Sequence, residues 1–268
     1  MTVLADAWAK FDRANQHARS FVEHAAAQAQ SRPYMITVDD EPETGWHICR
    51  AVRTGQPLVQ LPLIAGDLFT NYRTTLDYIA YQMFLVSGNP PTDKRADRVY
   101  YPITTKPEDW PSQRNRFLNG ITDDFAATVK ETQPCFRNDP GGSALADLAF
   151  FSRPDKHKHL TIMGTLTAAQ VHVTLHTPGG GPGLVDLEQV VTTVPRPIDN
   201  AELMRWRITR NGVPQTMAML FGPHPDVYAE YNVAFDISLS HGDRVCCHFS
   251  EIGEEVRRIL ELFEPLLP

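Results

Sequence analysis

The hydrophobic period of this chain changes near Asp155, and this change constrains the fold more than any other feature of the sequence. Before it, apolar residues recur every three or four positions, the spacing that places them on one face of a helix. After it, over residues 157–177, apolar and polar residues alternate as in a half-buried strand. The sequence therefore predicts an α+β protein, in which a helical amino-terminal part is followed by an antiparallel β-sheet capped by a carboxy-terminal helix.

The same change suggests where the chain divides. We expect residues 1–155 to be mainly helical with a small β-hairpin over residues 34–52, and residues 156–268 to form the β part and end in an amphipathic helix. The alternative is one integrated domain, because a chain of 268 residues suits either one large core or two small ones.

Two long helices dominate the predicted helical part. Residues 4–30 carry an apolar stripe in an alanine-rich context without Gly or Pro. Residues 66–84 form the second, central helix, with Gly66-Asp67 as its expected N-cap region.

The central helix carries polar residues on both flanks of its apolar stripe. Arg73 and Asp77 lie one turn apart and are expected to pair along the helix, whereas Asn71 and Tyr78 fall on the opposite side. A helix with this pattern is expected to have neighbours on more than one side.

Two hairpins are predicted in the β part. A turn centred on Ala168-Ala169 would join the two halves of residues 157–177. Asn211-Gly212 is the strongest short turn signal in the chain and predicts a second hairpin over residues 205–221. In it, Trp206 and Ile208 would share a face with Met217 and Met219.

Charge and composition exclude several classes of protein. The formal net charge of −7 argues against a general nucleic-acid or membrane-surface binder, since both need a positive surface. No apolar run approaches the ~20 residues of a transmembrane helix, and the charged amino terminus does not fit a signal peptide. The four cysteines form no C-x-x-C pair, which favours reduced thiols and a cytoplasmic protein.

Several short motifs, taken as a set over residues 1–160, resemble those of a widespread uncharacterised bacterial family of actinobacterial type. The family patterns are G-D-x-x-x-N-x-R-x-x-x-D-H, aromatic-Pro-Ile, Gln-Pro-aromatic and N-x-D-K-H-[RK]. This chain departs from them at Tyr78, where the family has His, at Cys135, where it has an aromatic residue, and at Arg153, where it has Asn. The resemblance implies a helical core followed by strands, and it implies no activity. The matching residues are Gly66-Asp67, Asn71, Arg73, Asp77, Tyr101-Pro102-Ile103, Gln133-Pro134 and Asp155-Lys156-His157-Lys158.

The family's R-x4-H spacing is similar to the signature of HEPN-type ribonucleases, which cleave RNA without metal. In that chemistry an Arg stabilises the charged transition state and a His moves the proton. This chain has Arg73, but with Tyr78 in place of the histidine, His157 or His159 would have to replace it. The structural alternative is a network of Arg73, Asp77, Asn71 and Asp155 that ties the central helix to the loop before the first strand of the β part.

The histidines of the predicted first hairpin suggest a metal site. His157 and His159 point to one side of a strand, and in the predicted register His176 lies diagonal to His159. Asp155 would be a further ligand. The alternative is a solvated strand face on which His and Thr are tolerated.

The leading hypothesis is a small-ligand or nucleotide-binding protein. Its polar cluster would lie where the central helix meets residues 155–159, and it consists of Asn71, Arg73, Asp77, Asp155 and His157. This cluster would hold an anionic or polar ligand, with Arg73 as the anion contact and Asp77 as its orienter. A HEPN-like endoribonuclease and a metal-dependent enzyme are the alternatives, RNA and a second copy of the chain are alternative partners, and the cofactor is left open. The candidate residues are Arg73, Asp77, His157 and His159 for catalysis, Asn71, Tyr78, Asp155 and Lys156 for ligand binding, and His157, His159 and His176 for metal.

Overall fold

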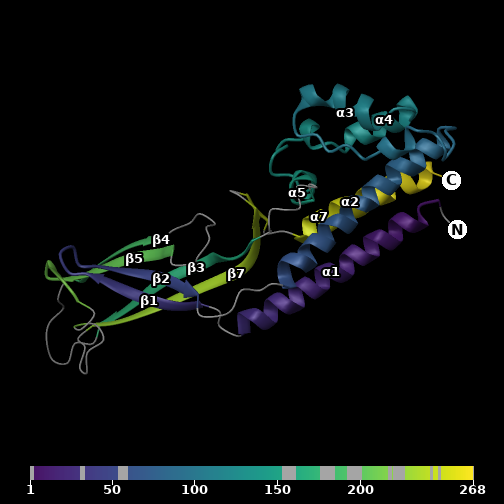
Figure 1. The fold of residues 1–268 in the computed structure, drawn as a ribbon. Coiled ribbons are helices and arrows are strands. Elements are labelled where there is room, and N and C mark those ends of the chain that lie inside the picture. The colour runs from purple at the N-terminus through teal and green to yellow at the C-terminus, as the bar shows by residue number, and fades with distance from the viewer. Residues whose placement is uncertain are drawn as a thin grey trace. The chain divides into compact units, whose positions relative to one another are not determined.

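The computed structural model confirms the α+β class, with helices near both ends of the chain and antiparallel strands between them (Figure 1). It describes residues 3–30, 34–53, 60–152, 161–175, 185–191, 201–216, 219, 227–241, 244–246 and 249–267. No helix within these ranges is long and apolar enough to cross a membrane.

The chain divides into two compact units, and both are discontinuous in sequence. The helical unit takes Met1–His24, Val59–Leu160 and His241–Pro268, and the sheet unit takes Ala25–Leu58 and Thr161–Ser240. This differs from the expected division at residue 155, because the amino-terminal hairpin belongs with the sheet and the carboxy-terminal helix belongs with the other helices.

Three helices build the core of the helical unit: α1 (Ala5–Gln30), α2 (Gln60–Val86) and α7 (Phe249–Phe263). The ring of Phe11 on α1 lies 5.8 Å from that of Tyr72 on α2. Helix α5 (Ala144–Phe151) stacks Phe151 on Phe69 of α2 at 5.2 Å. The apolar stripes predicted for the central and carboxy-terminal helices are buried as expected, through Leu68, Tyr72, Leu76, Ile79, Ala80 and Met83 of α2 and Val256, Ile259, Leu260 and Phe263 of α7.

The start of α2 differs from the prediction. The helix begins at Gln60, so Gly66-Asp67 lies inside it and the expected N-cap is wrong. Pro62 falls in the first turn, where backbone N–H groups have no intrahelical acceptor, so proline removes no hydrogen bond there.

Short helices and tight turns cover residues 87–136 of the helical unit. Gly120 has a φ of +93°, and a Cβ atom there would lie 2.8 Å from a guanidinium nitrogen of Arg95, so the position requires glycine. The Asn89 amide donates to the carbonyl oxygens of Phe84 and Gly120 at 2.9 and 2.8 Å, and so links the last turns of α2 to the turn at Gly120. The elements are the 3₁₀ helices η1 (Ala96–Arg98), η2 (Pro107–Asp109) and η3 (Pro134–Phe136), with helices α3 (Trp110–Phe117) and α4 (Asp123–Glu131); a further 3₁₀ helix, η4 (Glu264–Leu266), follows α7.

The main sheet has the strand order β1-β2-β5-β4, with β6 paired to β5. The antiparallel pairing of β1 with β2 confirms the predicted amino-terminal hairpin. Asn211 and Gly212 both have positive φ, 50° and 78°, and join β5 to β6 as the sequence predicts. Met219, however, is exposed while Trp206 is buried, so the expected shared face is wrong. The strands are β1 (Tyr34–Glu41), β2 (Trp46–Arg53), β4 (Val185–Val191), β5 (Ala201–Arg210) and β6 (Val213–Pro214).

The first predicted hairpin of the β part is wrong, because β3 (Thr161–Leu175) is one continuous strand. It pairs antiparallel with β7 (Val227–His241) along its length. The expected turn residues Ala168 and Ala169 lie opposite Ala234 and Val233, next to an irregularity in the register. Alanine offers none of the backbone or side-chain features that favour a turn, and a partner strand of equal length extends the ladder. The short strand β8 (Arg244–Cys246) follows β7 in the chain.

His47 is the most buried polar side chain described in the sheet unit, at 1% exposed. Its Nδ1 lies 2.7 Å from a carboxylate oxygen of Asp40 on β1, and its Nε2 lies 2.9 Å from the carbonyl oxygen of Gln215 beyond β6. The ring packs against Trp206 of β5 with 4.2 Å between centroids. One side chain of β2 therefore links the first strand of the sheet to the segment after its last turn.

We expect His47→Leu to destabilise the protein by about 1–3 kcal/mol, because it leaves the Gln215 carbonyl without its side-chain donor and Asp40 without its partner. Urea unfolding followed by tryptophan fluorescence measures this, since Trp206 packs on the ring. The control is His24→Gln on the exposed surface of α1, expected to stay within about 0.5 kcal/mol of wild type. An unchanged urea midpoint for His47→Leu would contradict the assigned role.

Candidate functional site

Arg73 and Asp77, the pair predicted on the central helix, together hold the backbone of Tyr101. The Arg73 Nε and Nη2 donate to the two Asp77 carboxylate oxygens at 3.3 and 3.0 Å. Nη2 also donates to the Tyr101 carbonyl oxygen at 2.5 Å, and the Tyr101 N–H donates to Asp77 Oδ1 at 3.0 Å. The predicted pairing is confirmed, and both side chains bond to each other and to the backbone of Tyr101.

This pair is largely removed from water, with the Arg73 and Asp77 side chains 24% and 21% exposed. Burial raises the pKa of the Asp77 carboxyl, and the charge of Arg73 together with the hydrogen bonds from Tyr101 and Arg73 opposes that rise. A half-buried carboxylate that depends on these donors is the pattern of a structural clamp.

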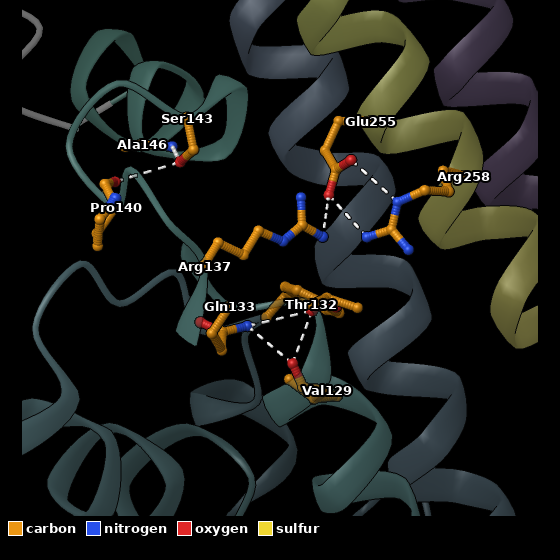
Figure 2. A network of polar contacts seen from close by, with 10 residues as sticks. Val129, Thr132, Gln133, Arg137, Pro140, Ser143, Ala146, Glu255 and Arg258 are labelled. Atoms are coloured by element: carbon orange, nitrogen blue, oxygen red, sulfur yellow. Dashed lines mark hydrogen bonds and ion pairs between the residues drawn. The ribbon is translucent and has the colours of Figure 1, made fainter. Parts of the chain in front are cut away.

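Gln133 forms a second clamp on the same extended segment. The Thr104 N–H donates to Gln133 Oε1 at 3.0 Å, and the Gln133 amide donates to the Val129 carbonyl at 3.1 Å (Figure 2). The Cys135 N–H donates to the Thr104 carbonyl at 2.9 Å. The Tyr101 hydroxyl lies 2.6 Å from Thr132 Oγ1 and is fully buried, which raises its pKa. Three motifs far apart in the sequence therefore meet on residues 101–104.

Glu255 joins its own helix, α7, to Arg137, the residue that directly follows η3, as Figure 2 shows. Its carboxylate lies 2.8 Å from guanidinium nitrogens of both Arg137 and Arg258. Burial alone would raise the pKa of Glu255, but the hydrogen bonds from Arg258 and Arg137 outweigh it and lower the pKa. The side chain is 13% exposed, so this ion pair is shielded from solvent on the Glu255 side.

Of the described residues of the predicted polar cluster, Arg73 and Asp77 contact each other and Asn71 bonds elsewhere. The Asn71 amide donates to the Asp67 carbonyl of its own helix at 2.7 Å, away from the Arg73 clamp, and Tyr78 is half-buried on α2. The other predicted site residues lie outside the described residues: Asp155, Lys156, His157, His159 and His176.

The basis of the metal prediction does not hold. It needed a turn at Ala168-Ala169 to bring His159 towards His176, and β3 runs straight through that position. Among the described residues, no group of three or more His, Cys, Asp and Glu side chains is arranged to hold a metal ion.

A pocket of about 400 Å³ lies next to the clamped segment, between η1 and α3. We call it the arginine pocket. Asp and Glu are absent from its described lining, as are His, Cys and Ser. Because the described lining has none of these side chains, which are the usual acids, bases and nucleophiles of enzymes, the pocket is better suited to binding than to acid–base catalysis. Its lining residues are Arg95, Arg98, Val99, Tyr100, Asn115, Arg116, Phe117 and Asn119.

The three arginines of the pocket differ in their partners. Arg95 is committed to Asp93, at 2.6 Å, and to Asn89, and its hydrogen bonds lower the pKa of Asp93 to about 2. Arg98 and Arg116 are exposed, and in the described part of the chain no carboxylate lies within ion-pair distance of either. The guanidinium of Arg116 lies 5.0 Å from the Phe117 ring centre.

Aromatic rings complete the arginine pocket. Tyr100 is 45% exposed and contacts Phe117 edge-on, with 5.9 Å between ring centres. Tyr100 directly precedes the residue that Arg73 and Asp77 hold, so the clamp fixes the backbone from which this ring projects. The buried clamp thus positions one wall of the pocket.

Sequence reasoning did not find the arginine pocket. By composition alone, residues 87–98 are typical of a charged loop and residues 110–119 of a surface helix or loop, and neither pattern indicates a site. The usable signal was the gathering of Arg95, Arg98, Arg114 and Arg116 in two short stretches of an otherwise acidic chain.

No protein-family model, no curated protein and no solved structure matches this chain.

We expect Arg73→Met to cost about 2–3 kcal/mol of unfolding free energy, because it leaves the Asp77 carboxylate and the Tyr101 carbonyl without their donor. Chemical denaturation followed by circular dichroism measures the loss. The double variant Arg73→Met with Asp77→Asn should lose about 1 kcal/mol less unfolding free energy than the sum of the losses of the two single variants, because it leaves no unpaired charge. Arg13→Met on the exposed face of α1 is the control. Strict additivity of the two substitutions would contradict the clamp.

Glu255 should make stability depend on pH in acid. Its pKa is lowered from the ordinary 4.5, so its contribution is complete above pH 4.5 and is lost as the pH falls through the folded-state pKa. We expect Glu255→Gln to cost about 2 kcal/mol at pH 7, a value reduced by the partial exposure of both arginines. Its deficit against wild type should shrink steadily below pH 4.5. A deficit independent of pH would show that charge is not what Glu255 contributes.

Proposed function

We propose that this protein binds a small phosphorylated ligand of the nucleotide class in the arginine pocket. One observation carries the proposal. Arg98 and Arg116 line the pocket without a carboxylate partner among the described residues, beside the exposed ring of Tyr100, in a chain with a net charge of −7.

The chemistry of the pocket matches the two ends of a nucleotide. Guanidinium groups present a planar fork that fits phosphate oxygens. A guanidinium without a carboxylate partner is stabilised most when it binds an anion. The exposed face of Tyr100 offers a stacking surface for a base, and Asn115 and Asn119 supply amide donors and acceptors. The volume of about 400 Å³ lies within the usual range for small-ligand sites.

The ligand class agrees with the leading hypothesis from the sequence, but the site is a different one. Arg73, expected to contact the anion, donates to Asp77 and to the Tyr101 backbone. Its proposed role is therefore indirect, through the clamp beneath Tyr100. The same hydrogen bonds give the ribonuclease alternative no support from Arg73.

We expect isothermal titration to detect binding of at least one of AMP, ADP, ATP and inorganic pyrophosphate. The double variant Arg98→Gln with Arg116→Gln should bind that probe roughly ten- to a hundredfold more weakly, because charge-assisted hydrogen bonds to the anion are lost. Binding of a nucleotide but not of pyrophosphate would assign part of the affinity to Tyr100, which Tyr100→Ala then tests.

The matched control is Arg114→Gln. Arg114 lies on the same helix, α3, but pairs with Asp123 and does not line the pocket. This variant should bind as wild type does. The proposal fails if none of the four probes binds, or if the double variant binds as tightly as Arg114→Gln.

A further inference from the structure

A groove of about 670 Å³ runs between α1 and α7 over the Tyr72 region of α2, within the helical unit. From its lining we infer that it binds an amphipathic carboxylate, an acyl chain whose head group contacts Arg257. This site is separate from the arginine pocket, and the two have no lining residue in common.

Gly253 lets α7 pack closely on the Tyr72 side chain at the floor of the groove. A Cβ atom at this position would lie 2.6 Å from the Tyr72 hydroxyl oxygen, so any larger residue would force α7 away from α2. The aromatic rings of Phe11, Tyr72 and Phe249 line the groove and make its floor mainly apolar. An apolar chain is the ligand part that such a surface favours.

The floor holds one fixed polar pair. Tyr72 is 2% exposed, and its hydroxyl donates to Asn15 Oδ1 at 2.7 Å. Burial raises the pKa of Tyr72 to about 12, with Arg257 opposing the rise, so the phenol stays neutral at physiological pH. A neutral hydroxyl beside Arg257 does not repel an incoming anion.

Arg257 supplies the charge for a carboxylate head group. Its guanidinium lies 5.3 Å from the ring centre of Phe11, and in the described part of the chain no carboxylate reaches it within ion-pair distance. Packing against the ring removes part of the guanidinium's hydration, which strengthens its attraction for an anion.

The groove is long and has distinct ends. At one end Arg257 packs over Phe11, and towards the other Phe249 packs against Phe21 at 4.8 Å, so α1 and α7 run antiparallel. From Phe11 to Val22 the helix rises about 17 Å. Val22 is 64% exposed and presents an apolar surface at the end far from Arg257. Arg19 and Glu23, one turn apart and of opposite charge, also line the groove towards this end. We place the head group at Arg257, where the guanidinium packs over Phe11, and the tail towards Phe249 and Val22.

Two carboxylates on the rim refine the expectation. Glu23 lies at the tail end, whereas Glu254 lies one turn before Arg257 on α7. Glu254 weakens the positive potential at the head-group position without pairing with Arg257. Its removal should therefore tighten binding of an anion and leave a neutral ligand unaffected.

The test is titration of the full-length protein with decanoate and, as the uncharged probe of equal chain length, 1-decanol. Wild type should bind decanoate roughly tenfold more tightly than decanol, the gain expected from one partly exposed charge-assisted contact. Arg257→Gln should abolish this preference and keep the affinity for decanol. Glu254→Gln should increase the preference for decanoate over decanol. Ala18→Phe, which fills the groove from α1, should remove binding of both probes while circular dichroism shows the fold retained.

The matched controls are Arg13→Gln, on the exposed face of α1 outside the groove, and the double variant of Arg98 and Arg116, both expected to bind decanoate as wild type does. The inference is overturned if decanoate does not bind, if decanol binds as tightly as decanoate, or if Ala18→Phe still binds both. Loss of decanoate binding in the Arg98 and Arg116 variant would place the carboxylate in the arginine pocket and equally overturn it.

Discussion

The helical unit depends on satisfying the backbone of one extended segment, residues 101–104, inside a bundle of helices. Such a segment cannot pair with its own neighbours, and a buried N–H or carbonyl group without a partner costs about as much as a lost hydrogen bond. The side chains of Arg73, Asp77 and Gln133 supply the partners. Helix α2 and the segment between α4 and η3 are held together because both contribute to one set of hydrogen bonds.

This constraint explains why the helices could be predicted from the sequence and the hydrogen bonds to residues 101–104 could not. The three long helices can be predicted from the sequence because burial of one helix face imposes a period on the apolar residues. These helices are predicted over residues 4–30, 66–84 and 254–263. The pairing of Arg73 with Asp77 follows from their spacing on α2. Their target, the backbone of Tyr101, lies far along the chain and carries no periodic signal, so the role of the motif as a clamp emerges only in three dimensions.

The two candidate sites were beyond sequence reasoning for a related reason. The arginine pocket combines η1 with α3, two short elements without amphipathic period, and its character depends on which of its arginines have no carboxylate partner among the described residues. The groove is lined by residues of α1, α2 and α7 that lie far apart in the sequence, and a single glycine inside a helical pattern, such as Gly253, does not predict a site. The wrong turn at Ala168-Ala169 shows the opposite failure. Alternating residues fit a hairpin and a long strand equally well, and only the partner strand β7 decides between them.

The discontinuous division of the chain has a consequence for its synthesis. Helix α7 buries Val256, Ile259, Leu260 and Phe263 in the helical unit, yet it follows the whole sheet unit in the chain. During translation the complementary apolar face of α2 is made long before its cover, and the unit cannot close until α7 has left the ribosome. Contacts of such long sequence separation also slow folding. The nascent chain should therefore be a substrate for chaperones that shield apolar helices, and this need would end when the last helix packs into place.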